Sequence, residues 1–412
     1  MRISWLSVSD RLGGSEIALE SMIRAVRAAR PDWVNQVILP GSGPLLERLE
    51  AAGASCAVVP MPSAVARVGE SAAVRQRWST GSALALGLRL GAGAVALPAY
   101  ESLIGRALSQ FRPDIIHTNG LKAHVLGARA GLHGTAVVWH LHEYVAPRPL
   151  TRWLMRRYVR ACDAIVANSA SVATDVSAMF EEKALVHVVR NAVDLDRFCP
   201  NGPASDLDDL SGLAAVGDSI VRVGLVATFA RWKGHEVFLD AMQRIPASDP
   251  VRGYIIGGPL YDTSGSQYTR RELEAMIDAR NLRSRVGLTG FVDSAPAMRA
   301  LDVVVHASVA PEPFGLVIAE AMACGRAVIT TATGGAAELV SPPHDAVATP
   351  PGDARALATE IERLAADPRQ REGLRAAARA SAIARFAPER MGAELVSVFE
   401  AVAARRSLAQ SA

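Results

Sequence analysis

The stretch DVVVHASVAPEPFGLVIAEAMACGRAVITT, residues 302–331, decides the predicted fold. It opens with an apolar run typical of a buried strand, passes through the loop PEPFG and continues in the apolar pattern of a packed helix. Gly325 follows at a position suited to the left-handed conformation that ends many helices, and AVITT has the pattern of a second strand. This order of strand, helix and strand predicts a parallel βαβ unit.

The same alternation of short apolar runs and longer helical patterns extends over almost the whole chain. It predicts an α/β protein with two doubly wound, Rossmann-like parallel sheets and a crevice between the carboxyl ends of the sheets. Residues 198–219 are rich in Pro, Gly, Ser and Asp, which is typical of a linker. We therefore expect a first domain over residues 1–200, a hinge over 201–218 and a second domain over 219–385.

The charge balance excludes one class of function. The chain carries 44 basic and 41 acidic residues, a net charge of +3, which is too balanced to predict nucleic-acid binding. Only 5% of the residues are aromatic, which argues against a protein built on the stacking of bases. Any phosphate-binding surface must therefore be local.

The cysteines and the N-terminus bear on location. The four cysteines lie far apart without a CxxC pair, which predicts a reduced, cytoplasmic protein with structural thiols. The opening MRISWLSVSD is typical of a first strand and not of a signal peptide. Residues 82–100 are the most membrane-like run, but Arg89 and several glycines and prolines interrupt it. We expect no transmembrane anchor.

The PEPFG loop predicts an anion site at a helix N-terminus. The amides of Phe314, Gly315 and Leu316 would lie where free N–H groups and the helix dipole attract negative charge, and Gly315 lets a ligand approach the backbone. A carboxylate repels phosphate, so Glu312 suits sugar hydroxyls beside it. Glu320, about one and a half turns later, suits the vicinal hydroxyls of a ribose. Spacing alone favours a simpler interpretation, a capping carboxylate and a solvated helix charge.

Residues 302–340 closely resemble the E-x7-E region of family-four glycosyltransferases, which have the GT-B fold. Glu312 and Glu320 match the two glutamates of that motif. In the family the first glutamate contacts the donor sugar and the second contacts the ribose of the nucleotide. The resemblance implies these roles here, and it implies a retaining transfer from a nucleotide-diphosphate sugar.

A basic segment of the second half agrees with this resemblance. RWKGHEVFLDA, residues 231–241, is similar to the family's basic motif, which implies that Arg231 and Lys233 neutralise the departing diphosphate. The alternative is a solvated charge pair at a helix start. The family often has an arginine five residues before the lysine, where this chain has Thr228, and we expect Arg231 to replace it.

A second segment implies the place of the nucleobase. Gly290, Phe291 and Val292 resemble the family's segment that lies along the base. Gly257 and Gly258 close a strand that we expect to lie nearby.

The first half supplies weaker signals. LGGSEIALESM, residues 12–22, resembles the family's glycine loop, in which Gly13 and Gly14 would let acceptor and donor phosphate approach the backbone. Any tight strand–helix turn also needs glycine. VVWHLHEY aligns His142 with the family's active-site histidine and leaves His140 as second choice; a structural histidine is the alternative. The resemblance also implies an acceptor-binding first domain and a last helix, residues 386–412, that returns to it.

One short motif bears on whether the protein binds a catalytic metal. Asp194-Leu195-Asp196 is a D-x-D sequence, which holds a divalent metal in another class of glycosyltransferase. Here it falls in a segment that resembles the NGVD turn of the family, and we interpret it as closing a loop. We predict no catalytic metal and no cofactor, since the nucleotide sugar is a substrate.

A basic helix has two interpretations, one of which is contact with a membrane. Residues 147–163 concentrate arginines, Arg152, Arg156 and Arg157 among them, around Trp153. Such a helix either rests on anionic lipid or is a solvated helix beside the cleft. We weigh the two equally.

The favoured function is a retaining, metal-independent glycosyltransferase that uses a UDP- or GDP-sugar. Its expected setting is the synthesis of envelope polysaccharide, lipopolysaccharide or glycolipid, with domain closure excluding water. A dinucleotide-dependent oxidoreductase is set aside, because the chain has LGGSE where that class needs G-x-G-x-x-G. A non-catalytic nucleotide-sugar-binding protein at the membrane surface stays open, because Thr228 departs from the family pattern.

Overall fold

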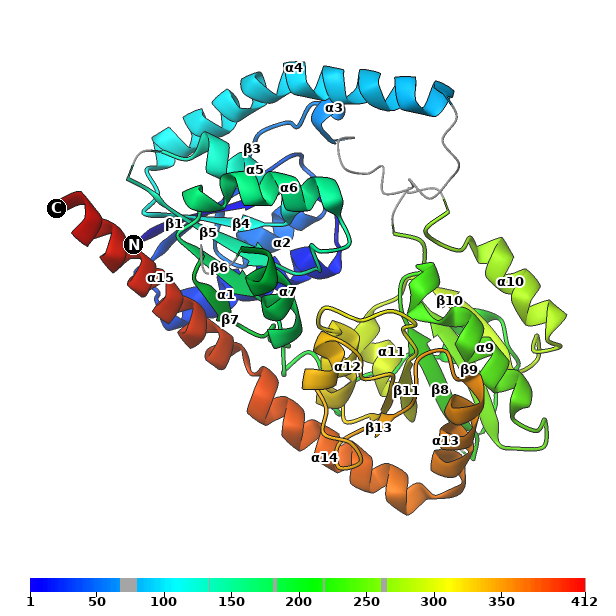
Figure 1. The fold of residues 1–412 in the computed structure, drawn as a ribbon. Helices are drawn as coiled ribbons and strands as arrows, with labels where there is room; N and C mark the ends of the chain where they lie inside the picture. The colour runs from blue at the N-terminus through cyan, green and yellow to red at the C-terminus, as the bar shows by residue number, and fades with distance from the viewer. Residues whose placement is uncertain (67–79, 133, 181–183, 218, 261–264, 412) are drawn as a thin grey trace. The chain divides into compact units, whose positions relative to one another are not determined.

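The computed structural model describes the chain except residues 67–79, 133, 181–183, 218, 261–264 and 412. The described chain forms two compact units (Figure 1). The first comprises Met1–Ala192 and Pro388–Ala412, and the second comprises Val193–Ala387.

The first unit is built on a parallel sheet whose described strands run in the order β3-β2-β1-β4-β5-β6-β7. The strands are β1 (Arg2–Ser7), β2 (Val34–Leu39), β3 (Ser55–Val58), β4 (Ile115–Asn119), β5 (Ala136–Leu141), β6 (Ala164–Ala167) and β7 (Val186–Val188). The described helices are α1 (Gly14–Ala29), α2 (Leu45–Ala51), α3 (Ser63–Ala66), α4 (Thr80–Phe111), α5 (Leu121–Ala130), α6 (Pro149–Tyr158), the 3₁₀ helix η1 (Val159–Ala161), α7 (Ala170–Phe180) and α15 (Pro388–Ser411).

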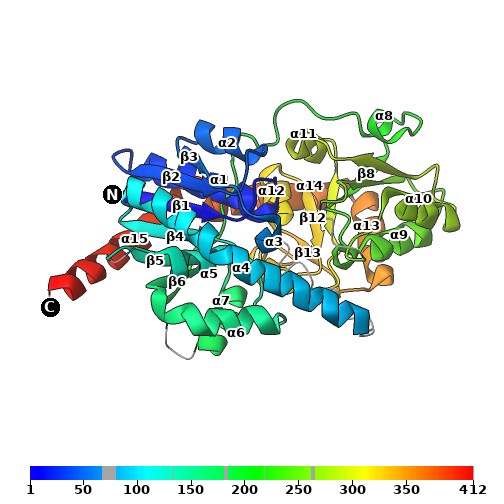
Figure 2. The ribbon, with the colours of Figure 1, turned by 90° about the horizontal axis from the view of Figure 1, so that it is seen from above.

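This sheet has two apolar faces, each covered by helices. Ile3 and Trp5 of β1 lie in one buried cluster with side chains of α1 and α15. Leu6 lies in another cluster, with side chains of α4, α5, α6 and α7. Successive side chains of a strand point to opposite faces, so the two helical layers lie on opposite sides of the sheet, as Figures 1 and 2 show. The predicted doubly wound arrangement is confirmed in this unit.

Helix α15 belongs to the first unit although it follows the second unit in the sequence. It packs along α1, where a Cβ on Gly392 would lie 2.5 Å from the carbonyl oxygen of Ala25. Phe399 of α15 is fully buried, and its ring meets that of Trp5 edge-on at a centroid distance of 5.8 Å. The sequence predicts a returning helix over residues 386–412, and the structure has α15 there.

The second unit has a parallel sheet with the strand order β10-β9-β8-β11-β12-β13 in the described chain. The strands are β8 (Val221–Val226), β9 (Val251–Ile256), β10 (Val286–Gly290), β11 (Val303–His306), β12 (Ala327–Thr330) and β13 (Val347–Ala348). The helices are α8 (Leu207–Ser211), η2 (Arg231–Lys233), α9 (His235–Arg244), α10 (Arg270–Ala279), α11 (Ser294–Arg299), α12 (Leu316–Ala323), η3 (Gly335–Glu338), α13 (Ala354–Ala366) and α14 (Pro368–Phe386), with η2 and η3 of the 3₁₀ type.

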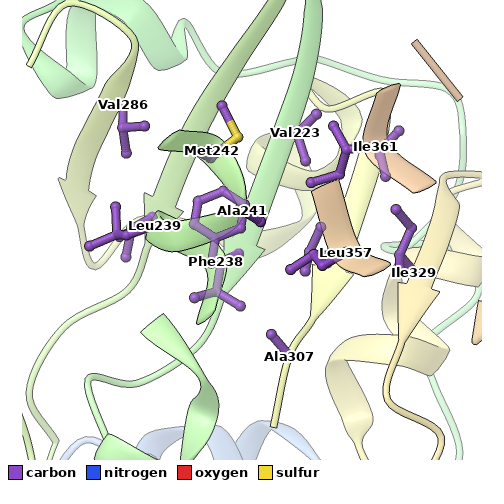
Figure 3. Close-up of a cluster of buried hydrophobic side chains, with 14 of the residues drawn as sticks. Val223, Phe238, Leu239, Ala241, Met242, Val286, Ala307, Ile329, Leu357 and Ile361 are labelled. Carbon is purple, nitrogen blue, oxygen red and sulfur yellow. The ribbon is translucent and has the colours of Figure 1, made fainter. Parts of the chain in front are cut away.

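Figure 3 shows the buried cluster on one face of this sheet. Val223 of β8 and Ile329 of β12 lie opposite Phe238 of α9 and Ile361 of α13, and all four are fully buried. The other face packs against α11, α12 and α14. Both predicted sheets are therefore present, each between two helical layers.

The segment expected as a hinge, residues 201–218, lies within the second unit. Asp208 is 4% exposed, and its Oδ1 accepts hydrogen bonds of 2.7 Å from Arg252 Nη1 and Tyr254 Oη. The chain passes between the units at Ala192–Val193 and Ala387–Pro388 instead. The polar composition typical of a linker conceals this buried carboxylate, which ties the segment to β9.

Chain order reverses once in each sheet, between β1 and β4 in the first and between β8 and β11 in the second. Doubly wound sheets bind ligands outside the carboxyl ends of the strands at such a reversal. The loops that follow these strands carry most of the predicted site residues.

Candidate functional site

Lys233 and Glu312 meet beyond the carboxyl ends of β8 and β11. The Nζ of Lys233 lies 2.8 Å from Oε2 of Glu312. Gly234 follows with a φ of 80°, and a Cβ there would lie 1.9 Å from the carbonyl oxygen of Ala307. Only glycine fits this turn, which therefore holds Lys233 close to the end of β11.

The Glu312 carboxylate is buried and held by several donors. Its Oε2 accepts hydrogen bonds from Lys233 Nζ, from His306 Nε2 at 3.1 Å and from Ser308 Oγ at 3.1 Å. Burial by itself raises the pKa of this carboxyl, but Lys233 and His306 outweigh burial and lower the pKa to about 2. Glu312 is an ionised, fixed acceptor at neutral pH.

Sequence reasoning missed His306, Ser308 and Trp232, which contact this pair, and Thr330, which contacts His306. His306 and Ser308 donate to Glu312, and His306 Nδ1 lies 3.1 Å from Thr330 Oγ1. The Nζ of Lys233 lies 4.0 Å from the ring centroid of Trp232, a cation–π contact. The signal for the first two was present in DVVVHAS, because polar side chains at the carboxyl end of a parallel strand lie at the ligand-binding edge.

The backbone of Glu312 fixes the PEPFG loop against the glycine-rich loop after β12. Its amide donates to the carbonyl oxygen of Thr333 at 3.3 Å, and its carbonyl oxygen accepts from the amide of Gly335 at 2.7 Å. Both ends of the residue are thereby positioned.

Helix α12 begins directly after Gly315, whose φ of 98° favours glycine. The carbonyl oxygen of Gly315 accepts the first helical bond, from Ile318, so the amides of Gly315 and Leu316 precede the intrahelical ladder. The Phe314 side chain is 3% exposed and packs edge-on against Phe386. The ring of Phe314 therefore belongs to the core.

Glu320 lies on α12 and is half-buried, with Arg197 as its charged neighbour. Burial raises the pKa of the Glu320 carboxyl to about 7, although Arg197 acts in the opposite direction. Arg197 itself forms an ion pair of 2.8 Å with Asp293. Arg197 is not among the site residues that the sequence predicts.

Arg231 lies two residues before Lys233 but has different partners. It forms an ion pair of 2.8 Å with Glu272, donates to the carbonyl oxygen of Gly265 and lies 4.3 Å from the ring centroid of Tyr268. The structure brings Lys233 to Glu312 and leaves Arg231 on the side of α10.

The two segments predicted beside the nucleobase, Gly257-Gly258 and Gly290–Val292, do lie together. The amide of Gly257 donates to the carbonyl oxygen of Gly290 at 3.0 Å, and a Cβ on Gly258 would lie 2.7 Å from the Phe291 ring. Phe291 is 61% exposed, whereas Val292 is partly buried against the core. An exposed ring seated on a glycine is suited to stack against a planar group.

In the first unit, Gly13 and Gly14 form the start of α1. Gly13 is extended, and its carbonyl oxygen accepts from the amide of Ile17 at 3.0 Å. A Cβ on Gly14 would meet no atom of the described residues within 4 Å. The backbone at this helix terminus is therefore open to close approach.

His142 follows β5 and bonds to a residue that sequence reasoning missed. Its Nε2 lies 2.6 Å from Oδ1 of Asn119, the last residue of β4, and burial lowers its pKa to about 4. His140 is fully buried, with Nδ1 3.2 Å from Nε2 of His117. His140 is thus enclosed in the core, and His142 is the predicted histidine at the strand end.

The D-x-D sequence has a structural part in the second unit. Asp194 Oδ1 accepts hydrogen bonds from the backbone amides of Asp196 at 3.2 Å and Arg197 at 2.9 Å. This is the geometry of an Asx turn, in which the side chain closes the loop.

Helix α6 presents an exposed basic and apolar surface. Trp153 is 64% exposed and Leu150 is 53% exposed, while Met155 anchors the helix in the core. Arg152, Arg156 and Arg157 are exposed around them. Over the residues that the structure describes, none of the helices combines the length and apolarity needed to cross a bilayer.

Comparison with known proteins identifies the family. Residues 220–367 match Glycosyl transferases group 1, and residues 45–197 match Glycosyltransferase Family 4. The D-inositol 3-phosphate glycosyltransferase of Thermomonospora curvata is 30% identical over 314 residues, which cover 68% of this chain and 71% of that protein. The chain belongs to the family-four glycosyltransferases.

Another D-inositol 3-phosphate glycosyltransferase, from Xylanimonas cellulosilytica, is 34% identical to this family-four glycosyltransferase over 257 residues, 60% of this chain and 59% of that protein. The chain spans about three fifths of the length of the first curated relatives that it matches.

Solved structures confirm the GT-B fold of this family-four glycosyltransferase. Anabaena Alr3699/HepE, crystallised in complex with UDP-glucose, is 26% identical, with a TM-score of 0.78 and coverage of 97% of this chain and 100% of that chain. WaaG, a glycosyltransferase involved in lipopolysaccharide biosynthesis, shares the fold at 15% identity, with a TM-score of 0.67 and coverage of 96% of this chain and 99% of that chain.

Proposed function

We propose that the protein moves a hexosyl-type group from a nucleotide-diphosphate sugar, a UDP- or GDP-sugar, to a hydroxyl of an acceptor. The observation that carries this proposal is the Lys233–Glu312 pair at the β8–β11 reversal. It offers an acceptor for sugar hydroxyls and a cation for phosphate at one sheet edge, on the loop that leads into α12. The UDP-glucose complex of the Anabaena relative supports a sugar nucleotide as donor.

The proposed reaction breaks the bond between the anomeric carbon and the β-phosphate oxygen of the donor. The acceptor oxygen bonds to the anomeric carbon, and its proton passes to the departing phosphate oxygen, which releases the nucleoside diphosphate. We propose that the product keeps the anomeric configuration of the donor. Lys233 and the amides of Gly315 and Leu316 would stabilise the charge that develops on the diphosphate.

The remaining predicted residues have subsidiary roles in this proposal. Glu320 would accept from ribose hydroxyls, and Phe291 would lie along the base. Arg231 would serve as a second cation only after leaving Glu272. His142 would contact the sugar.

We propose that no divalent metal assists the departure of the diphosphate. Lys233 and the terminus of α12 supply positive charge of the kind that a metal supplies in other transferases. Nucleotide binding and transfer should therefore persist in EDTA. A loss of transfer in EDTA that magnesium restores would contradict this part of the proposal.

The proposal is tested with a thermal-shift panel of UDP, GDP, ADP and their sugars, each with and without EDTA. We expect one base to raise the melting temperature, and the matching sugar nucleotide to donate to an acceptor panel of inositol phosphates, lipid-linked sugars and polysaccharide fragments. Proton NMR of the first product reads its anomeric configuration. Binding without transfer to any acceptor would favour a non-catalytic nucleotide-sugar-binding protein, and no binding would overturn both.

We propose further that α6 rests on anionic lipid, which would place the protein at the cytoplasmic face of a membrane and its acceptor among cell-envelope precursors. Exposed Trp153 and Leu150 offer insertion, and the arginines around them offer charge attraction. The protein should co-sediment with vesicles rich in phosphatidylglycerol and should not co-sediment with neutral vesicles. The triple variant Arg152→Ser, Trp153→Ser and Arg157→Ser should stay in the supernatant, while Arg271→Ser on α10 should behave as wild type.

A further inference from the structure

Asn119 links helix α1 to His142 through both ends of its side-chain amide. Its Nδ2 donates to the carbonyl oxygen of Ser15 at 3.1 Å, and its Oδ1 lies 2.6 Å from His142 Nε2. A carbonyl oxygen only accepts, so the nitrogen of the amide must face Ser15 and the oxygen must face His142. The opposite orientation would place two acceptors against each other at Ser15.

This orientation decides which nitrogen of His142 carries the hydrogen. Because Asn119 Oδ1 only accepts, His142 Nε2 must be the N–H donor. Burial lowers the pKa of His142 to about 4, so the ring is neutral near pH 7. The other nitrogen, Nδ1, is therefore a bare acceptor.

The bare nitrogen of His142 accepts no hydrogen bond from the described part of the chain. His142 Nδ1 is buried and has no hydrogen-bond partner among the residues that the structure describes. An unmade hydrogen bond of this kind costs free energy, which a donor from a ligand would recover.

The plane of the ring is held as well as its tautomer. The ring of His140 stacks on that of His142 with 4.4 Å between centroids and 9° between planes. His140 is the register partner of Asn119 on the neighbouring strand, so one pair of strand residues holds His142 from two directions.

We propose that Asn119 is a positioning residue that fixes His142 in its Nε2–H tautomer, so that Nδ1 accepts a hydrogen bond from a hydroxyl of the sugar substrate. The identity of that substrate rests on the proposed function, whereas the tautomer does not. In this role His142 accepts a hydrogen bond and does not donate a proton to the reaction.

The first test reads the tautomer in the free, full-length protein by ¹⁵N–¹H correlation NMR of the histidine side chains at pH 7.5, with the signals of His142 assigned from a His142→Gln spectrum. We expect a protonated Nε2 and an unprotonated Nδ1. A protonated Nδ1, alone or in an imidazolium, would overturn the proposal. This measurement holds whether or not transfer activity is found, so it separates this proposal from the proposed function.

The second test is a double-mutant cycle with the donor and acceptor that give transfer. Asn119→Ala should lower kcat/KM roughly tenfold, the size of one hydrogen bond, in the wild-type background, and less than about twofold in a His142→Ala background. Melting curves establish that each variant is folded. An equal loss in both backgrounds would show that Asn119 acts through the fold alone, and would refute a role through His142.

Discussion

Lys233 and Arg231 lie on the same turn, yet only Lys233 meets the carboxylate of Glu312. Since Lys233 supplies a preorganised charge, Lys233→Ala should lower kcat roughly 100- to 1,000-fold, as loss of one such donor does elsewhere. Arg231→Ala is the matched control. It removes an exposed ion pair with Glu272 and should lower kcat by less than about threefold. Steady-state kinetics with the identified donor compares the two, and equal losses would show that Arg231 shares the charge of the diphosphate.

The residue scale also shows how far the sequence predicts the site. Glu312 and Lys233 were each predicted as site residues, because the E-x7-E resemblance names one and the basic motif names the other, but their contact with each other was not predicted. His306 and Ser308 were missed although they stand at the carboxyl end of a predicted strand, because that position alone does not identify Glu312 as their partner. Asn119 was missed for the same reason, because its partners Ser15 and His142 come from separate segments of the chain.

Glu312 precedes α12 and Glu320 lies on it, and the fold shifts the pKa values of the two carboxyls in opposite directions. In the folded protein the pKa of Glu320 is about 7, against an ordinary value of 4.5. Between pH 4.5 and pH 7 the folded state therefore binds more protons than the unfolded state. Stability therefore falls as pH rises through this window, by about 1–3 kcal/mol. Glu320→Gln removes the penalty and should be more stable than wild type at pH 8, with the gain vanishing near pH 4.

Glu312→Gln should change stability in the opposite direction to Glu320→Gln. With a folded pKa of about 2, Glu312 contributes stability above its ordinary value of 4.5 and loses that contribution as pH falls toward 2. The variant should be less stable than wild type at pH 8, and the deficit should shrink below pH 4.5. Urea unfolding at pH 3, 4, 6 and 8 measures both variants. Parallel pH profiles for the two would contradict these assignments.

At the scale of elements, the turn after η2 depends on glycine twice over. Gly234 has a φ of 80°, and a Cβ there would also collide with the carbonyl group of Ala307. Gly234→Ala should therefore displace Lys233 and reduce both transfer activity and melting temperature. Gly212→Ala is the control. Gly212 has a φ of 68°, but none of the described residues lies within 4 Å of a Cβ there, so the change should cost only the backbone strain of about 1–2 kcal/mol. Equal effects would mean that the close contact of Gly234 with Ala307 is unimportant.

Helix α8 lies in the second unit, although the polar composition of its segment predicted a hinge. The carboxylate of Asp208 is the buried partner of Arg252, which is 9% exposed. Asp208→Asn leaves that guanidinium underpaired and should destabilise the second unit by about 3–5 kcal/mol. Asp209→Asn changes the exposed neighbouring carboxylate and should cost less than about 0.5 kcal/mol. Thermal unfolding followed by circular dichroism compares them, and a melting temperature for Asp208→Asn equal to that of wild type would show that residues 201–218 behave as the predicted linker.

At the scale of the molecule, the alternation of strands and helices predicted both sheets because it is a local pattern repeated along the chain. The division into units was less predictable, because it depends on contacts between distant segments. The segment around Asp208 belongs to the second unit, where Asp208 bonds to Arg252 of β9, and α15 packs on Trp5 through Phe399 and on α1 through Gly392. Neither contact leaves a periodic signal in its own segment.

The discontinuity of the first unit makes a prediction about fragments. The second unit is one continuous segment, 193–387, whereas the sheet of the first unit depends on α15 to cover Trp5 and neighbouring side chains. A fragment of residues 193–387 should therefore melt cooperatively alone. A fragment of residues 1–192 should not, because it exposes a core face that the hydrophobic effect would otherwise bury.

Addition of a peptide of residues 388–412 to the fragment 1–192 should restore a cooperative transition, and its midpoint should rise with peptide concentration, as binding to the folded state requires. The same peptide with Phe399→Ala is the matched control and should restore it poorly, since Phe399 is fully buried against Trp5. If fragment 1–192 melts cooperatively without the peptide, the first unit does not need α15 to fold. The chain would then consist of two independently folding units that follow each other in the sequence.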